Sequence, residues 1–276
     1  CISALESHSI RVYSVPTADF TAPSYVCTRE EAEIAYVGQA GNSAQFIWNL
    51  ASASGDTARS TSPFEINWTN AGMKTLSLQV EENGCISAPF VHQLEVKARP
   101  QIYAGTDQLL CSGDTIQLDA QSLPGIQYRW YPSGGLNNDS IAQAELSLRA
   151  VHSQVDTLIF RLEGNDGYCS GSDSIQVVLA PMPEAKFTLP EPQCFNGNAF
   201  DFKADGAFTE DASFLWNFGP DAYSHTPYEK DQENIHFEAT GKHPVSLTIS
   251  QYGCSSNLFT DSITVYGHPD AAFDLS

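Results

Sequence analysis

The sequence predicts an all-β chain made of tandem antiparallel β-sandwich modules, and three observations lead to this prediction. Alternating strand-like segments that run into a proline recur along the chain. Cysteines recur with the same period, and a tryptophan stands between the two cysteines of each period. Strict alternation of apolar and polar residues indicates strands with one buried face, and no helical period of any length competes with it.

The proline-terminated segments define the period. SIRVYSVP, QLEVKARP, SIQVVLAPMP and SITVYGHP end at Pro16, Pro100, Pro183 and Pro269, which are 84, 83 and 86 residues apart. Proline cannot donate to a strand ladder, so it ends one strand before the next module. A period of this length indicates an array of modules. The predicted divisions are the C-terminal strand of a preceding module (1–15), three modules (16–99, 100–182 and 183–268) and the start of a following module (269–276).

The cysteines obey the same period and predict one disulfide within each module. The expected pairs are Cys27–Cys85, Cys111–Cys169 and Cys194–Cys254, with separations of 58, 58 and 60 residues. Cys1 precedes Pro16 by 15 residues, as the second cysteine of a module would; the alternative is a lipidated N-terminal cysteine. Zinc sites need close cysteine pairs, and the sequence has none. Evenly spaced pairs indicate structural disulfides and an oxidising compartment.

Each module has a tryptophan about twenty residues after its first cysteine. These predicted core tryptophans are Trp48, Trp130 and Trp216. A strand is expected before each of them (EIAYVG, TIQLDA and AFDFKA), and a long strand is expected to lead into the second cysteine. The order Cys, Trp, Cys on short strands predicts immunoglobulin-like sandwiches, with the indole packed against an inter-sheet disulfide.

Modules one and three also resemble the PKD domain, a bacterial and animal surface sandwich. The resemblance rests on Trp-x-Phe-Gly at 216–219 and on an aromatic-x3-Gly turn at 237–241, matched by Trp48-x-Leu50 and by Trp68 to Gly72 in module one. The acidic turn that usually follows Trp-x-Phe-Gly is replaced by PDAYS and ASASGD. Module two looks like the Ig-like repeats interleaved with PKD modules in giant Bacteroidota surface proteins. The resemblance implies export by type IX secretion and a role as a cell-surface stalk, a gliding-motility-type adhesin or a spacer in an enzyme.

The charge balance excludes some partners. The chain has 13 Lys and Arg against 33 Asp and Glu, a formal net charge of −20. Nucleic acid is not expected, because binding it requires clustered cations. No apolar run is long enough for direct membrane insertion. The N-terminus shows no signal peptide, so export signals are expected outside this sequence.

No catalytic motif is present, and the chain is not expected to be an enzyme. Calcium is the one cofactor considered: Asp19 and Asp270 follow module-joining prolines and are weak candidates for an inter-module clamp. The alternative is solvated linker acids, since no acidic Ca²⁺ loop is present. Six Asp-Ser/Thr stretches match Bacteroidota O-glycan sequons or plain strand starts; they begin at Asp56, Asp114, Asp139, Asp156, Asp173 and Asp261.

Two functions follow as hypotheses. The first is a non-catalytic structural or adhesive segment of a large extracellular repeat protein, whose partners are neighbouring modules and surface glycans or a host or substratum. The alternative is a carbohydrate- or protein-binding accessory region of a secreted hydrolase. Its candidate ligand residues are aromatic: Tyr128, Tyr131, Tyr223 and Tyr228.

Overall fold

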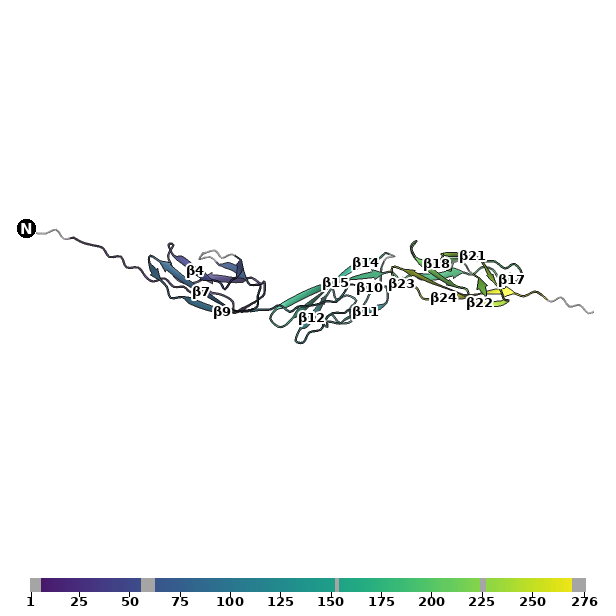
Figure 1. Ribbon diagram of the computed structural model, residues 1–276, viewed down its shortest axis with the longest axis horizontal. Helices are drawn as coiled ribbons and strands as arrows, with labels where there is room; N and C mark the ends of the chain where they lie inside the picture. Colours follow the sequence, from purple (N-terminus) through teal and green to yellow (C-terminus); the bar gives the residue numbers. More distant parts are fainter. Residues whose placement is uncertain (1–5, 56–62, 152–153, 224–226, 270–276) are drawn as a thin grey trace, which may run out of the picture. The chain divides into compact units, whose positions relative to one another are not determined.

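The structure is a computed structural model of the 276-residue chain, and it describes residues 6–55, 63–151, 154–223 and 227–269. The described part contains strands and no α-helix. Its strands pair in three separate sets, within residues 20–97, 108–180 and 184–266. We call these sets the first, second and third sandwich (Figure 1).

The first sandwich has two sheets. One has the order β1 (Phe20–Thr21), β3 (Ala32–Tyr36), β6 (Phe64–Asn67) and β5 (Ser54–Gly55). The other has the order β2 (Tyr25–Cys27), β9 (Phe90–Lys97), β7 (Gly72–Glu82) and β4 (Gln45–Asn49), and β8 (Cys85–Ile86) also pairs with β7. In these two sheets β2 runs parallel to β9, and the other neighbouring strands are antiparallel.

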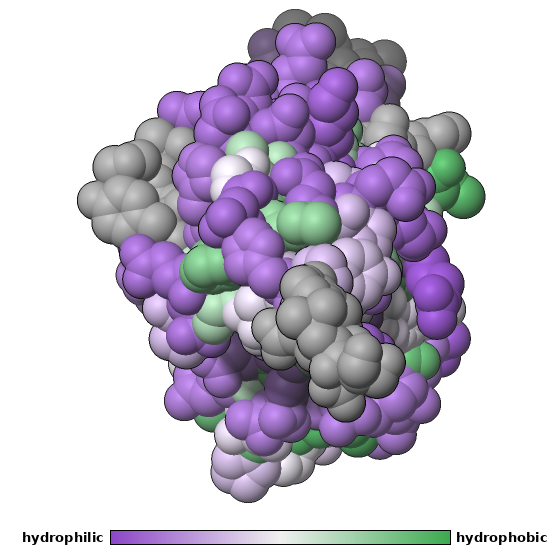
Figure 2. Space-filling model, turned by 90° about the vertical axis from the view of Figure 1, so that its right-hand side faces the viewer, coloured by the Kyte–Doolittle hydropathy of each residue, from purple (hydrophilic) through white to green (hydrophobic). Residues whose placement is uncertain are grey.

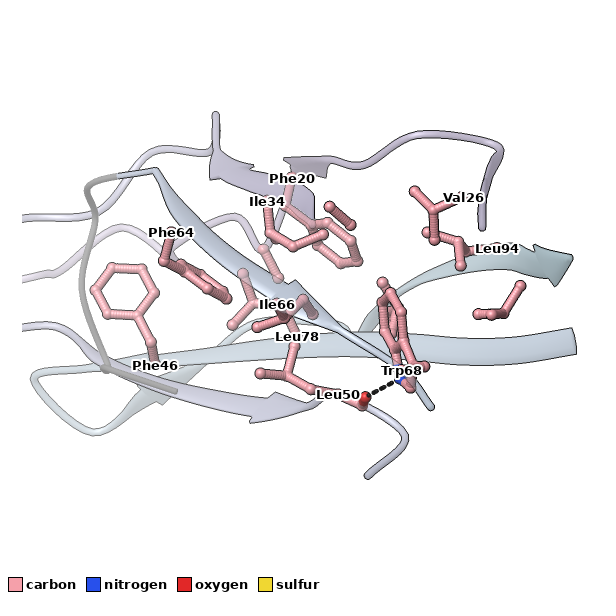
Figure 3. Packing of buried hydrophobic residues seen from close by; sticks show 14 of the residues in the cluster. Phe20, Val26, Ile34, Phe46, Leu50, Phe64, Ile66, Trp68, Leu78 and Leu94 are labelled. Carbon is pink, nitrogen blue, oxygen red and sulfur yellow. Dashed lines mark hydrogen bonds between the residues drawn. The ribbon is translucent and has the colours of Figure 1, made fainter. Parts of the chain in front are cut away.

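The core of the first sandwich lies between its two sheets. Alternate residues of β7 point inward, so Leu76, Leu78 and Val80 are fully buried. They meet Ile34 and Ile66 from the opposite sheet in one apolar cluster (Figure 3). This is the packing that the alternating pattern predicts, because successive strand residues face opposite sides of a sheet.

The third sandwich repeats this plan. One sheet has the order β16 (Glu184–Thr188), β18 (Phe200–Ala207), β21 (Asp231–Phe237) and β20 (Ala222–Tyr223). The other has the order β17 (Gln193–Cys194), β24 (Phe259–Tyr266), β22 (Gly241–Gln251) and β19 (Ser213–Asn217), with β23 (Cys254–Ser255) on β22. Its core is rich in aromatic residues: Phe200, Phe202, Trp216 and Phe237 are all buried.

The second sandwich has a smaller second sheet. Its main sheet has the order β10 (Gln108–Cys111), β15 (Ser170–Ala180), β14 (Asp156–Asn165) and β12 (Gln127–Tyr131). Two strands, β11 (Thr115–Gln117) and β13 (Glu145–Ser147), form the other sheet. Trp130 and Phe160 of the main sheet are buried, and Leu118 and Leu146 are buried on the side of the smaller sheet.

The strand order is that of an immunoglobulin-like sandwich. The first and third sandwiches have the same strand order. One sheet is β1-β3-β6-β5 or β16-β18-β21-β20, and the other is β2-β9-β7-β4 or β17-β24-β22-β19. This arrangement corresponds to immunoglobulin strands A, B, E and D facing A′, G, F and C. The predicted all-β fold of tandem immunoglobulin-like sandwiches is therefore confirmed.

One predicted strand is absent. Residues 6–19, which contain SIRVYSVP, form no strand, and Ile10 and Val12 are each 88% exposed. The similar segment of the first sandwich is β9, which is hydrogen-bonded on both edges, to β2 and β7. No strand of the described residues pairs with the SIRVYSVP segment at 9–16, and an isolated strand without partners is unstable in water.

The contacts divide the chain into two compact units. Residues 123–127 and 163–172, at one end of the second sandwich, belong to the unit that contains the first sandwich. The remainder of the second sandwich belongs to the unit of the third. Each unit therefore contains parts of two consecutive sandwiches.

Candidate functional site

The described residues form two disulfides, and each joins one sandwich to the next. Cys27 of the first sandwich bonds to Cys169 of the second, 142 residues later, with Cα atoms 5.8 Å apart. Cys111 of the second bonds to Cys254 of the third, 143 residues later, with Cα atoms 5.7 Å apart. Each bond lies inside one compact unit. We call these bonds staples.

The predicted pairing within modules, Cys27–Cys85, Cys111–Cys169 and Cys194–Cys254, is therefore wrong. Among the described residues Cys85 and Cys194 are free thiols. Immunoglobulin disulfides join strands B and F, but the corresponding strands β3 and β7 contain no cysteine. The cysteines lie instead on strand A′ and in the hairpin before strand G.

The length of the last strand separates the two cysteines of one sandwich. Cys27 pairs with Lys97 at the end of β9, whereas Cys85 comes before that strand begins at Phe90. Eight residues of strand span about 25 Å at roughly 3.3 Å each. Disulfide Cα atoms must lie within about 7 Å. A bond from Cys27 to Cys85 would have to cross the whole sandwich, while a bond to the next sandwich does not.

The three strand-end cysteines occupy the same backbone position. Cys27, Cys111 and Cys194 each end a strand that runs parallel to the last strand of their sandwich. In each case the next residue donates its backbone N–H to that last strand, with N to O distances of 2.8, 2.8 and 2.9 Å for Thr28, Ser112 and Phe195. All three cysteines therefore have the same position relative to the last strand of their sandwich.

The hairpin cysteines are equally well placed. Cys85 and Cys254 each follow a two-residue turn, Asn83-Gly84 or Tyr252-Gly253, whose residues all have positive φ. Positive φ at both turn positions is the type I′ geometry of tight hairpins. Two residues after the cysteine, Ser87 and Ser256 accept hydrogen bonds from the N–H groups of Val80 and Ile249 at 2.9 and 3.0 Å. In the second sandwich a longer turn, Asp166–Tyr168, leads to Cys169.

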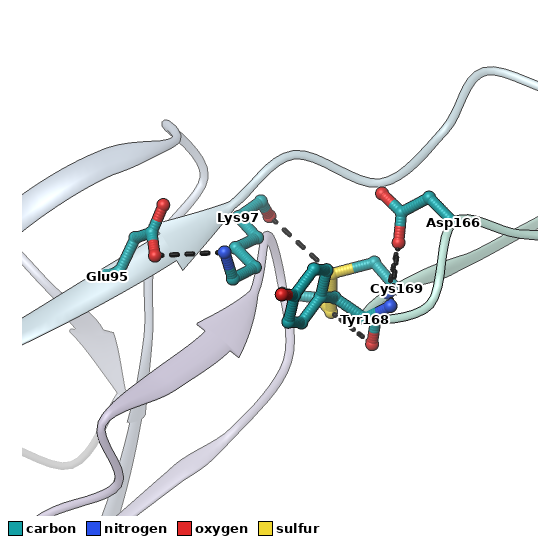
Figure 4. A network of polar contacts seen from close by, with 6 residues as sticks. Glu95, Lys97, Asp166, Tyr168 and Cys169 are labelled. Carbon is teal, nitrogen blue, oxygen red and sulfur yellow. Dashed lines mark hydrogen bonds and ion pairs between the residues drawn. A yellow bond between two sulfur atoms is a disulfide. The ribbon is translucent and has the colours of Figure 1, made fainter. Parts of the chain in front are cut away.

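Side chains from both sandwiches surround the first staple (Figure 4). The Tyr168 ring lies next to Lys97, whose ammonium nitrogen is 4.1 Å from the ring centroid. Tyr25 meets Tyr168 edge to face. The Arg99 guanidinium donates to the carbonyl oxygens of Thr28 and Ser170, both at 2.9 Å, and so bridges the two sandwiches. These contacts fix the position of the disulfide beyond the covalent bond itself.

Two charged groups of this network have shifted pKa values. The backbone N–H groups of Cys169 and Tyr168 donate to Asp166 Oδ1 at 2.7 and 2.9 Å and lower the pKa of that carboxyl. The ion pair with Glu95, at 2.9 Å, raises the pKa of Lys97. Both groups are therefore charged at neutral pH, and the ionised Asp166 side chain holds the turn that carries Cys169.

The second staple has fewer polar contacts. The Gln251 amide donates to the Pro181 carbonyl oxygen at 3.4 Å. A Cβ atom added to Gly253 would lie 2.8 Å from Leu109 Cδ2, so the glycine turn is in close contact with the strand of the second sandwich. A larger residue at this turn would require the Leu109 side chain to shift.

Of the three tryptophans expected in the cores, Trp130 and Trp216 are buried, whereas the buried tryptophan of the first sandwich is a different residue. Trp130 is fully buried and Trp216 is 2% exposed. Trp48 is only half-buried, at the side of the core. The fully enclosed indole there belongs to Trp68, whose Nε1–H donates to the Leu50 carbonyl oxygen at 3.2 Å (Figure 3). The aromatic-x3-Gly pattern contained this signal, because Trp68 matches the buried Phe237.

The calcium candidates receive no support from the described residues. Asp19 is exposed, and Asp270 lies outside the described part of the chain, as does Cys1. Within that part no group of three or more His, Cys, Asp or Glu residues could hold a metal ion. The described residues also include no helix long and apolar enough to cross a membrane.

The predicted ligand aromatics do not form one group. Tyr128 and Tyr131 belong to β12 of the second sandwich, and the Tyr128 hydroxyl donates to the Gln121 carbonyl oxygen at 3.2 Å. Tyr223 belongs to β20 of the third sandwich, and Tyr228, 73% exposed, follows it in a loop. The face shown in Figure 2 is mainly hydrophilic, with small hydrophobic areas.

No family model and no curated protein matches the sequence. Several solved structures of multidomain proteins resemble the chain over most of its length. An I-band fragment of titin is 13% identical, with 94% of this chain and 100% of that chain covered and a TM-score of 0.42. Extracellular domains 3–5 of Drosophila OTK are 10% identical (94% and 99% covered, TM-score 0.39). The three N-terminal domains of the bacteriophage RB49 outer capsid protein Hoc are 9% identical (92% and 99% covered, TM-score 0.40).

Proposed function

We propose that this chain is a non-catalytic structural segment of an extracellular repeat protein, and that it limits extension under tension. The observation that carries this proposal is the overlap of the two staples. The loop closed by Cys27–Cys169 and the loop closed by Cys111–Cys254 share residues 111–169. The staples therefore change how far the chain can be pulled out.

The overlap shortens the covalent path between Cys27 and Cys254. Without disulfides, the chain from Cys27 to Cys254 extends to about 800 Å when it is fully unfolded, at roughly 3.5 Å per residue. With both staples intact, the shortest path runs from Cys27 to Cys169, back to Cys111 and across to Cys254. Only the residues between Cys111 and Cys169 lie on that path, so its length is about 200 Å. Tension would thus reach the bonds between sandwiches before most of the chain is drawn out.

The disulfides also support a location outside the cytoplasm, where thiols are oxidised. The finer form of the proposal is a cell-surface stalk or gliding-type adhesin of the Bacteroidota kind, exported by type IX secretion. It is supported by the PKD-like motifs, in which Trp216, Phe218 and Phe237 are buried. In this form the domains are 16–99, 100–182 and 183–268, and the adhesin contacts surface glycans or a substratum.

Single-molecule pulling tests the function. The chain would be held at its two ends and unfolded with and without dithiothreitol. We expect the extension between Cys27 and Cys254 to increase about four-fold on reduction, because the bypassed residues then bear load. The Cys27→Ser/Cys111→Ser double variant should give the longer extension in both conditions. An extension that does not depend on the reductant in the unmodified chain would rule out a tension-limiting role.

A further inference from the structure

Two cysteines of the repeat have no partner among the described residues. Cys85 is the hairpin cysteine of the first sandwich, and Cys194 is the strand-end cysteine of the third. Both staples join a strand-end cysteine to the hairpin cysteine of the following sandwich. Cys85 thus lacks a strand-end partner, and Cys194 lacks a hairpin partner.

We propose that Cys85 and Cys194 are open halves of further staples, and that each forms a disulfide with another sandwich of this repeat type. Cys85 takes the strand-end cysteine of a sandwich that precedes the first. Cys194 takes the hairpin cysteine of a sandwich that follows the third. This inference rests on the proposed function, because it extends the same cross-linking along the array.

The local structure at both thiols matches that of the bonded cysteines. Glu82 pairs with Cys85 in the β-ladder as Gln251 pairs with Cys254. The backbone at Cys194 has the register of the backbone at Cys27 and Cys111, including the hydrogen bond from the next residue. Neither thiol needs a rearrangement of its own strand to reach the geometry of a staple.

The space around the two type I′ turns differs between the bonded Cys254 and the unbonded Cys85. At Gly253, next to the bonded Cys254, an added Cβ atom would contact Leu109 at 2.8 Å. At Gly84, next to Cys85, it would meet nothing within 4 Å. The turn beside Cys85 is therefore open at the place where the Gly253 turn meets the second sandwich; the longer turn before the bonded Cys169 is also open, at Gly167.

Apolar side chains are exposed at both open ends. Tyr266 pairs with Cys194 in the ladder and is 55% exposed, whereas Ala180 takes the same place beside the bonded Cys111 and is fully buried. Ile86, directly after Cys85, is also 55% exposed. Docking of another sandwich would cover apolar surface at each end, which favours association.

Bond formation requires an external oxidant, which a low-molecular-weight disulfide such as oxidised glutathione supplies. One cysteine thiolate attacks a glutathione sulfur, forms a mixed disulfide and releases one glutathione thiolate. The second cysteine thiolate then attacks the protein-bound sulfur and releases the second glutathione. Two cysteine thiols are oxidised to one disulfide, and one glutathione disulfide is reduced to two thiols.

A tandem fusion tests the proposal with the repeat period intact. Residues 1–268 are followed directly by residues 16–276, so that Pro16 of the second copy replaces Pro269 of the first. Cys194 of the first copy and Cys85 of the second are then about 144 residues apart, against 142 and 143 in the two staples. Cys1→Ser removes the one cysteine that belongs neither to the staples nor to the Cys85 and Cys194 positions.

Two fusions with the same amino-acid composition provide the comparison. The joining variant carries Cys85→Ser in the first copy and Cys194→Ser in the second, so the pair at the junction remains. The control carries Cys194→Ser in the first copy and Cys85→Ser in the second. It keeps Cys85 in the first sandwich of the fusion and Cys194 in the last, which are not in consecutive sandwiches. Both would be refolded at low protein concentration with reduced and oxidised glutathione.

The readout is the number of free thiols in the denatured protein, together with a non-reduced peptide map. We expect no free thiol and a Cys194–Cys85 peptide in the joining variant, and two free thiols in the control. Two free thiols in the joining variant, with all four staples formed, would overturn this inference alone. Absence of the Cys27–Cys169 and Cys111–Cys254 peptides from both fusions would instead overturn the proposed function.

Discussion

The rings of Tyr25 and Tyr168 meet edge to face, with centroids 5.7 Å apart and planes inclined at 86°. Tyr25 belongs to β2 of the first sandwich, and Tyr168 directly precedes Cys169 of the second. Edge-to-face geometry places the positive ring edge against the negative ring face, which is the favoured arrangement for aromatic pairs. The pair thus adds a noncovalent contact to the link that the first staple makes.

A double-mutant cycle on this pair measures its contribution. We expect Tyr25→Ala and Tyr168→Ala to be coupled by about 0.5 kcal/mol in the free energy of unfolding, at the lower end for aromatic pairs because both rings are partly exposed. Urea titrations of the wild type, both single variants and the double variant give the coupling. Tyr168→Phe keeps the ring and should leave the stability unchanged; additive single effects would show that the rings do not interact.

Serine substitutions distinguish the observed disulfide pairing from pairing within modules. Cys27→Ser and Cys169→Ser break the same bond and should destabilise the chain equally. The loss should be up to about 5 kcal/mol, the chain-entropy value for a loop of this length. Cys85→Ser should change the free energy of unfolding by less than about 0.5 kcal/mol, as for other substitutions away from structural features. A Cys85→Ser effect as large as that of Cys27→Ser would support the Cys27–Cys85 bond instead.

Trp68 should contribute more to stability than Trp48. Trp68→Ala removes a buried indole and leaves the Leu50 carbonyl without its donor, so we expect a loss of about 3–5 kcal/mol. Trp48→Ala removes a half-buried ring and should cost about half as much. Thermal or urea unfolding of both variants, with Trp130→Ala as a reference for a fully buried indole, checks the order. Equal losses at the two positions would contradict it.

A pair of carboxylates on the first sandwich predicts a pH dependence. The hydrogen bond with Glu31, together with its charge, raises the pKa of Glu65 above its usual value. The folded state therefore holds this proton more tightly than the unfolded state, and the resulting stabilisation is lost as the pH rises through the raised pKa. Glu65→Gln should be more stable than the wild type at pH 7, and the difference should disappear at pH 3. Urea midpoints at both pH values measure it, and Glu233→Gln, at an exposed position of the corresponding strand β21 of the third sandwich, serves as a matched control.

Alternation and the proline period predicted the strands well, because both reflect local requirements of a sandwich. The expected strands around EIAYVG, TIQLDA and AFDFKA correspond to β3, β11 and β18. The SIRVYSVP segment shows the limit of this reasoning. It has the same alternation of apolar and polar residues as β9. A segment becomes a strand only when neighbouring strands pair with it, and its own sequence does not show whether they are present.

The disulfide pairing does not follow from the repeat spacing, because cysteines of one repeat are not close in space. Cys27 and Cys85 lie 58 residues apart in one repeat, yet the whole length of β9 separates them in space. A usable signal was present in the hairpin residues Asn83-Gly84, which place Cys85 at the beginning of the last strand. The partner of a cysteine at the end of that strand then has to come from another sandwich.

The overlapping staples also determine what a protease can do to this chain. A single backbone cut between Cys27 and Cys111 leaves the pieces joined through Cys27–Cys169, and a cut between Cys169 and Cys254 leaves them joined through Cys111–Cys254. A cut between Cys111 and Cys169 is spanned by both bonds. No single nick from Cys27 to Cys254 can therefore release a fragment, so surface loops in this region can be cleaved once without loss of the attached sandwiches.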